Sequence, residues 1–206
     1  MKITKISPQK DSSRINLYVD GEFYLGLPSE AIIEFKLKKD MELDHETAQR
    51  LQCYDELQRT KSSAYKYLSY RQRTVSEMMD YLARKGFEQQ SISNVIELLK
   101  ESGFLNDESF ARAYVDDKTR LNDLGAYRLK AELRKKGIDK DLIKETLSDL
   151  EPDIEHLVEL VQKKYSNSLT GDENSTMRKA AGFLQRKGYG YDVIKKVLEK
   201  LGSVEE

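Results

Sequence analysis

From residue 46 onward, apolar residues recur three and four positions apart, and polar residues fill the positions between them. This spacing places the apolar side chains on one face of an α-helix. Thr74 and Glu77 form the pattern of a capping box, and Asp139 and Asp153 stand where helix caps belong. The polar stretch 166–174 predicts a loop. We predict helices over about 46–70, 74–85, 89–101, 106–121, 125–136, 139–149, 153–165, 175–187 and 190–201.

The first 45 residues follow a different pattern. Apolar and polar residues alternate in Lys2–Ser7 and Arg14–Val19, as they do in a β-strand with one buried face. Asp20-Gly21 separates the second run from a third over 22–26, and an Asp-Gly pair favours a hairpin because the turn needs positive φ. Pro28 begins a short helix that reaches Phe35, and a connector follows. We therefore expect a small β-rich module over residues 1–45.

Three short strings in the helical part are versions of one another. They are Leu82–Phe87 (LARKGF), Leu133–Ile138 (LRKKGI) and Leu184–Tyr189 (LQRKGY), and their glycines are separated by the same step of 51 residues. A glycine just past a helix takes the left-handed conformation that closes it, and cations in the last turn oppose the negative end of the helix dipole. Three such strings at a fixed period indicate a tandem repeat.

The apolar positions around these glycines repeat as well. Residues four and eight before each glycine, and six and ten after it, are apolar in every copy: Leu82, Met78, Ile92 and Ile96; Leu133, Leu129, Ile143 and Leu147; Leu184, Ala180, Ile194 and Leu198. Each copy therefore has two helices whose apolar stripes face a common interior. We predict a mainly α fold, an elongated tandem array of three three-helix repeats preceded by a β-hairpin-containing module. The expected domains are 1–45, 46–105 (a linking helix with the first repeat), 106–152 and 153–206.

Composition narrows the class of protein. Hydrophobic residues make up 38% of the chain and charged residues 34%, which suits thin cores spread over stacked helical units. The net charge is −1, so an anion-binding surface must come from segregated charge. Cys53 is the single cysteine, which excludes an intramolecular disulfide, and we expect it to be a buried or half-buried apolar residue. An apolar leader and a membrane span are both absent, so we expect a cytoplasmic protein without a membrane partner.

Sequence signatures of catalysis are missing. The two histidines, His45 and His156, are far apart, and His45-Glu46 lacks the second histidine that a zinc site of that type needs. Neither a glycine-rich phosphate loop nor a Gly-x-Ser-x-Gly string occurs. The pair Asp116-Asp117 lies beside cations and reads as a solvated helix face. We expect no catalytic residue, no metal and no cofactor, and therefore no enzyme.

Basic residues gather at the repeated helix ends. If the units stack with a small rotation, equivalent residues form a stripe suited to a phosphate backbone or an acidic protein surface. The alternative is that these cations only stabilise their own helices. Tyrosines 81, 127, 189 and 191 could stack on bases, although packing in a core or interface is the favoured interpretation. The candidate residues are Arg71, Arg73, Arg84, Lys85, Arg128, Arg134, Lys135, Lys136, Arg186, Lys187, Lys195 and Lys196.

Over about residues 60–201 the chain resembles the RecX family, the regulatory proteins of the RecA recombinase. The resemblance is carried by the repeated Leu-x-Arg/Lys-Lys-Gly strings, by Glu101–Ala111 (ESGFLNDESFA) and by Arg71–Thr74 (RQRT). Residues 1–45 resemble the N-terminal extension of longer members. The third unit departs most from the pattern, because Ala180 replaces a larger apolar residue and Gly190 opens its last helix.

The resemblance implies a regulator that binds the helical groove of the RecA–DNA filament and inhibits recombination and ATP hydrolysis. We expect a monomer whose partners are the RecA filament and, weakly or only through RecA, single-stranded and also double-stranded DNA. Two alternatives stay open. The chain could bind DNA alone through units that resemble helix-turn-helix modules, or it could be a helical scaffold for another protein.

Overall fold

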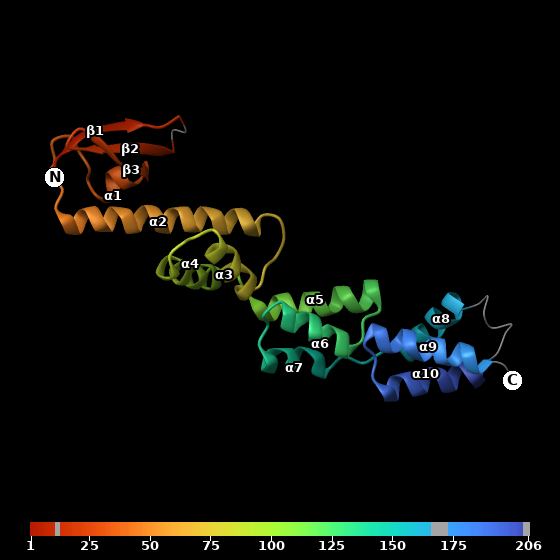
Figure 1. Ribbon diagram of the computed structural model, residues 1–206. Helices are drawn as coiled ribbons and strands as arrows, with labels where there is room; N and C mark the ends of the chain where they lie inside the picture. Colours follow the sequence, from red (N-terminus) through yellow and green to blue (C-terminus); the bar gives the residue numbers. More distant parts are fainter. Residues whose placement is uncertain (11–12, 166–172, 204–206) are drawn as a thin grey trace. The chain divides into compact units, whose positions relative to one another are not determined.

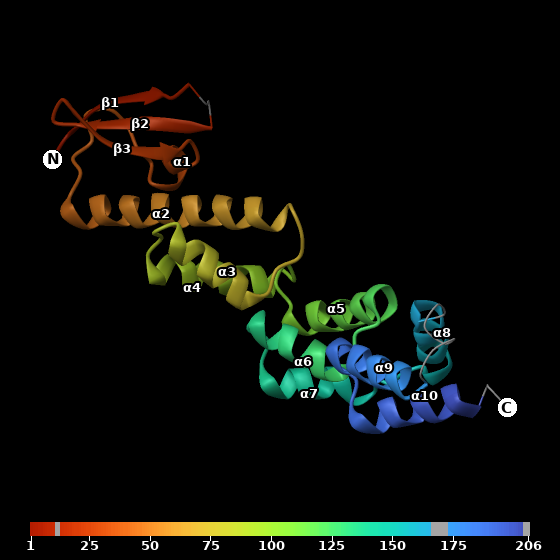
Figure 2. The same ribbon diagram turned by 45° about the vertical axis from the view of Figure 1, so that its right-hand side comes forward.

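The computed structural model describes residues 1–10, 13–165 and 173–203 (Figures 1 and 2). Contacts within the chain divide it into two compact units, Met1–Leu105 and Asn106–Glu206. The fold is mainly helical, with three three-helix repeats and an N-terminal antiparallel sheet, which confirms the predicted fold class.

Three antiparallel strands form the sheet in the order β1-β2-β3: β1 (Ile3–Pro8), β2 (Arg14–Val19) and β3 (Glu22–Pro28). The β2–β3 hairpin turns at Asp20 and Gly21, whose φ values of 51° and 92° explain the Asp-Gly pair. The predicted hairpin is therefore confirmed, with β3 ending two residues later than expected. Alternate residues of β2 point into the core of this module.

Two helices follow the sheet, namely α1 (Ala31–Glu34), which is shorter than predicted, and α2 (His45–Leu68). The Asp44 carboxylate caps α2 by accepting the amide of Thr47 at 2.6 Å. Leu51 belongs to the core beneath the sheet, whereas Ala64 belongs to the core of the first repeat. The helix therefore contributes to two cores, and Figures 1 and 2 show it between the sheet and the next two helices.

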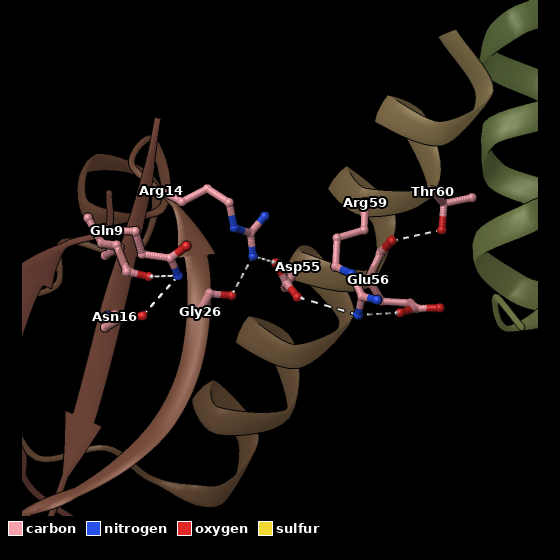
Figure 3. Close-up of polar contacts among 9 residues, drawn as sticks. Gln9, Arg14, Asn16, Gly26, Asp55, Glu56, Arg59 and Thr60 are labelled. Carbon is pink, nitrogen blue, oxygen red and sulfur yellow. Dashed lines mark hydrogen bonds and ion pairs between the residues drawn. The ribbon is translucent and has the colours of Figure 1, made fainter. Parts of the chain in front are cut away.

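An ion pair links the sheet to α2 (Figure 3). Arg14 on β2 donates from Nη2 to Asp55 Oδ1 at 2.7 Å and to the carbonyl of Gly26 at 2.9 Å. The Asp55 side chain is only 8% exposed, and its second oxygen lies 4.0 Å from Arg59 Nη1. Because a buried carboxylate without a cation is costly, this pair fixes the position of α2 against the sheet.

The same stretch of α2 also holds the first repeat. Glu56 Oε2 lies 3.7 Å from Arg59 Nη1, and Glu56 Oε1 accepts the backbone amide of Glu88 at 3.1 Å. Glu88 is the N-cap of α4 (Gln89–Glu101) and lacks a side-chain cap of its own. A carboxylate from α2 therefore satisfies an amide at the start of α4.

The first repeat is completed by α3 (Val75–Arg84). Thr74 Oγ1 accepts the amide of Glu77 at 3.1 Å, and Glu77 Oε2 accepts the amide of Thr74 at 3.4 Å. These two hydrogen bonds confirm the predicted capping box.

The second unit holds the other two repeats. They consist of α5 (Asp107–Asn122), α6 (Ala126–Lys135) and α7 (Lys140–Ser148), and of α8 (Ile154–Tyr165), α9 (Glu173–Lys187) and α10 (Tyr191–Ser203). The predicted caps are confirmed, since Asp139 accepts the amide of Asp141 at 2.8 Å and Asp153 that of His156 at 3.0 Å. Of the predicted loop 166–174, residues 166–172 lie outside the described part, and α9 already begins at Glu173.

The repeated apolar positions behave as predicted in the first two repeats and differ in the third. Residues four and eight before each glycine are fully buried in every repeat, Ala180 included. After the glycine, Ile92 and Ile143 are buried, whereas Ile194 is only half-buried. The buried residues of α10 are Val197 and Leu201, which are equivalent to the buried Val95 and Leu99 of the first repeat.

One prediction about a single residue was wrong. Cys53 lies on α2 and is exposed, although it was expected to be buried or half-buried. The neighbouring buried positions are Leu51 and Asp55, so the contact faces of α2 pass on either side of the cysteine. Among the described helices, none combines the length and apolarity that crossing a bilayer requires.

Replacing Arg14 by methionine should leave the buried Asp55 carboxylate with only the more distant Arg59, whose Nη1 is 4.0 Å away. We expect the local opening free energy of β2 and β3 to fall by about 3 kcal/mol, measured by hydrogen–deuterium exchange of their amides. Arg112→Met is the matched control, because Arg112 pairs with Glu108 at 2.8 Å on an exposed surface; its effect should stay below about 0.5 kcal/mol. Equal, small effects of both substitutions would show that the Arg14–Asp55 pair does not anchor the sheet.

Candidate functional site

The three repeated strings close their helices with the same hydrogen bonds. The carbonyl of the leucine four residues before the glycine accepts the amide of the residue after the glycine, at 3.4, 3.1 and 3.1 Å in the three repeats. The glycines have φ values of 81°, 77° and 94°. This is the Schellman arrangement, in which only glycine adopts the required φ without strain. The repeat therefore presents two cations at the same place on each helix end.

The cation directly before the glycine packs over aromatic rings of its own repeat. The distances from Nζ to the ring centroids are 5.7 Å for Lys85 over Tyr81, 5.1 and 5.4 Å for Lys136 over Tyr114 and Phe110, and 5.6 Å for Lys187 over Phe183. Cation–π contacts at such distances contribute to stability. This position therefore has a structural role in every repeat.

The cation two residues before the glycine is exposed in every repeat. Arg84 donates from Nε to the carbonyl of Asp80 at 3.1 Å. Lys135 and Arg186 have no ion pair or hydrogen bond to any described residue. These three side chains are accessible to anionic groups of a partner.

The candidate arginines before α3 are held by their own repeat. Arg71 forms an ion pair with Glu77 at 3.0 Å, so it contacts the glutamate of the capping box. The guanidinium carbon of Arg73 lies 3.8 Å from the centroid of the Tyr67 ring, and its Nε is buried without a hydrogen-bond partner.

The other candidate cations lie on α6 and α10. Arg128 pairs with Glu132 at 2.8 Å, and Lys195 with Glu199 at 3.7 Å. Arg134 and Lys196 are exposed and, within the described ranges, pair with no carboxylate.

The last two repeats meet through backbone atoms. The amide of Gly125, at the start of α6, donates to the carbonyl of Lys187 at 2.9 Å, and the amide of Tyr127 donates to the carbonyl of Gly188 at 3.0 Å. Figure 2 shows the end of α9 beside the start of α6. Unpaired amides of one helix thus meet unpaired carbonyls of another. A Cβ on Gly125 would lie 2.5 Å from the Gly188 carbonyl oxygen, so this joint requires glycine.

Asp123 adds charge to this joint. It ends α5 with φ 50°, and its carboxylate lies 3.7 Å from Lys187 Nζ and 2.8 Å from His156 Nε2. The hydrogen bond with Asp123 raises the pKa of His156 above its usual value. Lys187 also donates to the carbonyl of Asn122. Sequence reasoning missed this cluster because its members are 33 and 64 residues apart and belong to no motif.

The repeats place Lys187 and Lys135 at opposite ends of α6. Lys187 lies at the start of that helix, and Lys135 is its last residue. A helix of ten residues is about 15 Å long. The cations at the helix ends of the second and third repeats therefore lie at opposite ends of α6, and Lys187 at one of these ends is paired with Asp123.

The four tyrosines divide into two groups. Tyr81 stacks on Tyr67 with 3.9 Å between ring centroids, and Tyr189 packs against the third core, as the favoured interpretation expected. Burial and the nearby Asp123 raise the pKa of Tyr189 to about 12. Tyr127 and Tyr191 do not pack in a core, because their side chains are 71% and 78% exposed; packing at an interface with a partner stays a prediction for them.

The described residues contain no group of three or more histidine, cysteine or acidic side chains that could hold a metal ion. The exposed cations can bind anionic groups, and the exposed aromatic rings can stack on planar groups.

Four protein-family models match the chain. They are the regulatory protein RecX N-terminal domain over residues 1–44, and the first, second and third three-helix domains of RecX over residues 61–99, 106–147 and 151–198.

Individual proteins give the same result. The regulatory protein RecX of Bacillus subtilis (strain 168) is 35% identical over 202 residues, which cover 97% of this chain and 76% of that protein. The regulatory protein RecX of Clostridium perfringens (strain 13 / Type A) is 34% identical over 205 residues, which cover 97% and 96%. A crystal structure of regulatory protein RecX matches with a TM-score of 0.76 at 26% identity, covering 96% of this chain and 98% of that one. RecX from Lactobacillus salivarius matches with a TM-score of 0.68 at 28% identity, covering 72% and 98%.

Because of the Asp123–His156 contact, the stability of the joint between the last two repeats should depend on pH. Because the folded pKa of His156 is raised, the stabilisation is fully present below its unfolded pKa of about 6.5 and is lost as the pH rises through the folded pKa. An NMR titration of the His156 ring should show this raised pKa, and Asp123→Asn should lower it. Asp117→Asn removes a carboxylate paired with Arg120 instead, and should leave the titration unchanged. If the pKa of His156 is the same in the Asp123→Asn variant, the hydrogen bond between Asp123 and His156 is contradicted.

Proposed function

The chain belongs to the RecX family, and we propose that it binds the RecA–DNA filament in its helical groove and inhibits the recombinase and its ATP hydrolysis. The relatives are named as regulatory proteins, which supports regulation as the role of this chain. We further propose that it acts as a monomer and contacts DNA weakly or only through RecA.

The observation that carries this proposal is the exposed cation repeated at each helix end. Arg84, Lys135 and Arg186 occupy equivalent positions, and none of them pairs with a carboxylate among the described residues. Helix capping alone needs a cation near the carbonyls and does not need three accessible ones. A filament of protein and DNA presents carboxylates and phosphates that such cations would bind.

Autonomous DNA binding is a second candidate. The repeats are three-helix units, and such units resemble helix-turn-helix modules. The net charge of −1 gives no general attraction to DNA, which favours the regulatory proposal. A steep fall of DNA affinity with salt, measured without RecA, would favour the second candidate.

The proposal is tested by following the single-stranded-DNA-dependent ATP hydrolysis of RecA while this protein is titrated in. Action on a filament predicts progressive loss of activity at ratios well below one molecule per RecA. Unchanged hydrolysis at a molar excess would reject the proposal.

Reversing the exposed cations should weaken that inhibition. In the double variant Lys135→Glu and Arg186→Glu, we expect the inhibitory concentration to rise about tenfold or more, because attraction becomes repulsion at two positions. Neither side chain has a partner among the described residues, so we expect only a small loss of stability, about 0.3–1 kcal/mol for each charge at the helix end. The control reverses two exposed lysines outside the repeated strings, Lys66→Glu and Lys144→Glu, and should inhibit like the unmodified protein. Equal inhibition by both double variants would show that Lys135 and Arg186 are not part of the binding surface.

A further inference from the structure

An open groove lies at the joint of the last two repeats. Its volume is about 600 Å³, and it is bounded by the start of α6, the end of α9 and the start of α10. Tyr127 and Tyr191 line it with exposed rings, and Ile194 and Leu198 line it with half-buried aliphatic side chains. The groove thus combines aromatic and apolar surface with access to solvent.

Comparison of equivalent repeat positions shows that the third repeat opens this surface. The residue two after the glycine is acidic in the first two repeats, Glu88 and Asp139, and is Gly190 in the third. A Cβ at Gly190 would lie 3.2 Å from Cε2 of the Tyr127 ring, so the missing side chain makes room for that ring. The next position carries Gln89 in the first repeat and the exposed Tyr191 in the third.

The aliphatic floor of the groove, formed by Ile194 and Leu198, also results from a difference between the third repeat and the other two. Ile92 and Ile143 are each 1% exposed in their repeats, but the equivalent Ile194 is only half-buried. Val197 and Leu201 are buried in the third core, as the equivalent Val95 and Leu99 are in the first, but Ile194 lies at the edge of its core. Apolar surface that the other repeats bury is therefore accessible to a ligand.

Exposed cations without carboxylate partners lie on two of the helices that border the groove, α6 and α9. Lys130 and Arg134 stand three and seven residues after Tyr127, on the same face of α6. Arg178 stands three residues before Ala181, on the face of α9 that lines the groove. All three cations are exposed, and none pairs with another residue in the described part of the chain.

We propose that this groove binds a base of single-stranded DNA. The base lies against the rings of Tyr127 and Tyr191, and the phosphates on either side are attracted by the cations of α6 and α9. Every base has a planar face, so the site accepts any sequence. The inference rests on the proposed function, which supplies single-stranded DNA as the ligand, and it assigns the contact to a specific place on the chain.

Charge favours DNA over an apolar protein segment as the occupant. A purely apolar segment would contact the apolar floor of the groove, but it would offer no anionic group to the three unpaired cations. Within the groove itself, Lys195 is paired with Glu199 at 3.7 Å, so its net contribution is close to neutral. The unpaired positive charge lies on α6 and α9, beyond the residues that line the groove, where it would attract the phosphates of a strand that crosses the groove.

The test compares two fluorescein-labelled oligomers by anisotropy, one of about 20 thymidines and one abasic chain of equal length. Their phosphates are alike, so a difference in affinity reports the bases. We expect the unmodified protein to prefer thymidine by at least about fivefold. The double variant Tyr127→Ala and Tyr191→Ala should bind both oligomers alike, while Tyr127→Phe with Tyr191→Phe keeps the preference because the rings remain.

Tyr70→Ala is the matched control, because Tyr70 is 72% exposed and lies in the other compact unit. It should keep the preference for thymidine. Equal binding of the two oligomers by the unmodified protein would overturn the base site, and so would a preference that survives the double alanine substitution.

The RecA assay separates this inference from the proposed function. If the double alanine variant keeps its base preference but loses inhibition, the groove holds a protein segment, and the base site is rejected while RecA regulation stands. If the unmodified protein does not inhibit RecA, the proposed function fails, and the comparison of the two oligomers still decides whether the groove binds a base.

Discussion

In each of the three helical repeats, a glycine with positive φ ends the second helix and lets the chain turn into the third. The turn lets the buried leucine of the second helix and the apolar face of the third share one core. It also fixes two cations at the helix end, one over an aromatic ring and one toward solvent. The conformation of one residue per repeat therefore determines both the core and the charged surface.

Gly188 has a second role that the other two glycines are not shown to have. Its carbonyl and that of Lys187 accept amides from the start of α6, so two repeats share backbone hydrogen bonds. The close approach excludes a side chain at Gly125 and places Tyr127 beside Gly190. The groove is therefore a consequence of the joint, because it lies where α6, α9 and α10 come together.

Much of this fold could be predicted from the sequence, because its signals are local. Helix periodicity, the Asp20-Gly21 turn and the Thr74–Glu77 capping box each depend on neighbouring residues, and the 51-residue step repeats one local string three times; the structure confirms the elements they predict. The Asp123 cluster and the joint at Gly125 depend on residues more than 30 positions apart, so no local pattern reveals them. The exposure of Cys53 and Tyr127 depends on which helix faces find a neighbour, which composition does not determine.

The central claim is that backbone contact at Gly125 joins the last two repeats. Gly125→Ala tests it most directly by hydrogen exchange at the Tyr127 amide, because Gly125 has a φ of −84° and alanine adds no backbone strain there. We predict a loss of protection of at least about tenfold. Gly202→Ala is the matched control, because this α10 glycine has no positive φ and its added Cβ would meet the nearest atom at 3.9 Å; it should leave the Tyr127 amide unchanged. Full protection of that amide in the Gly125→Ala variant would contradict the account.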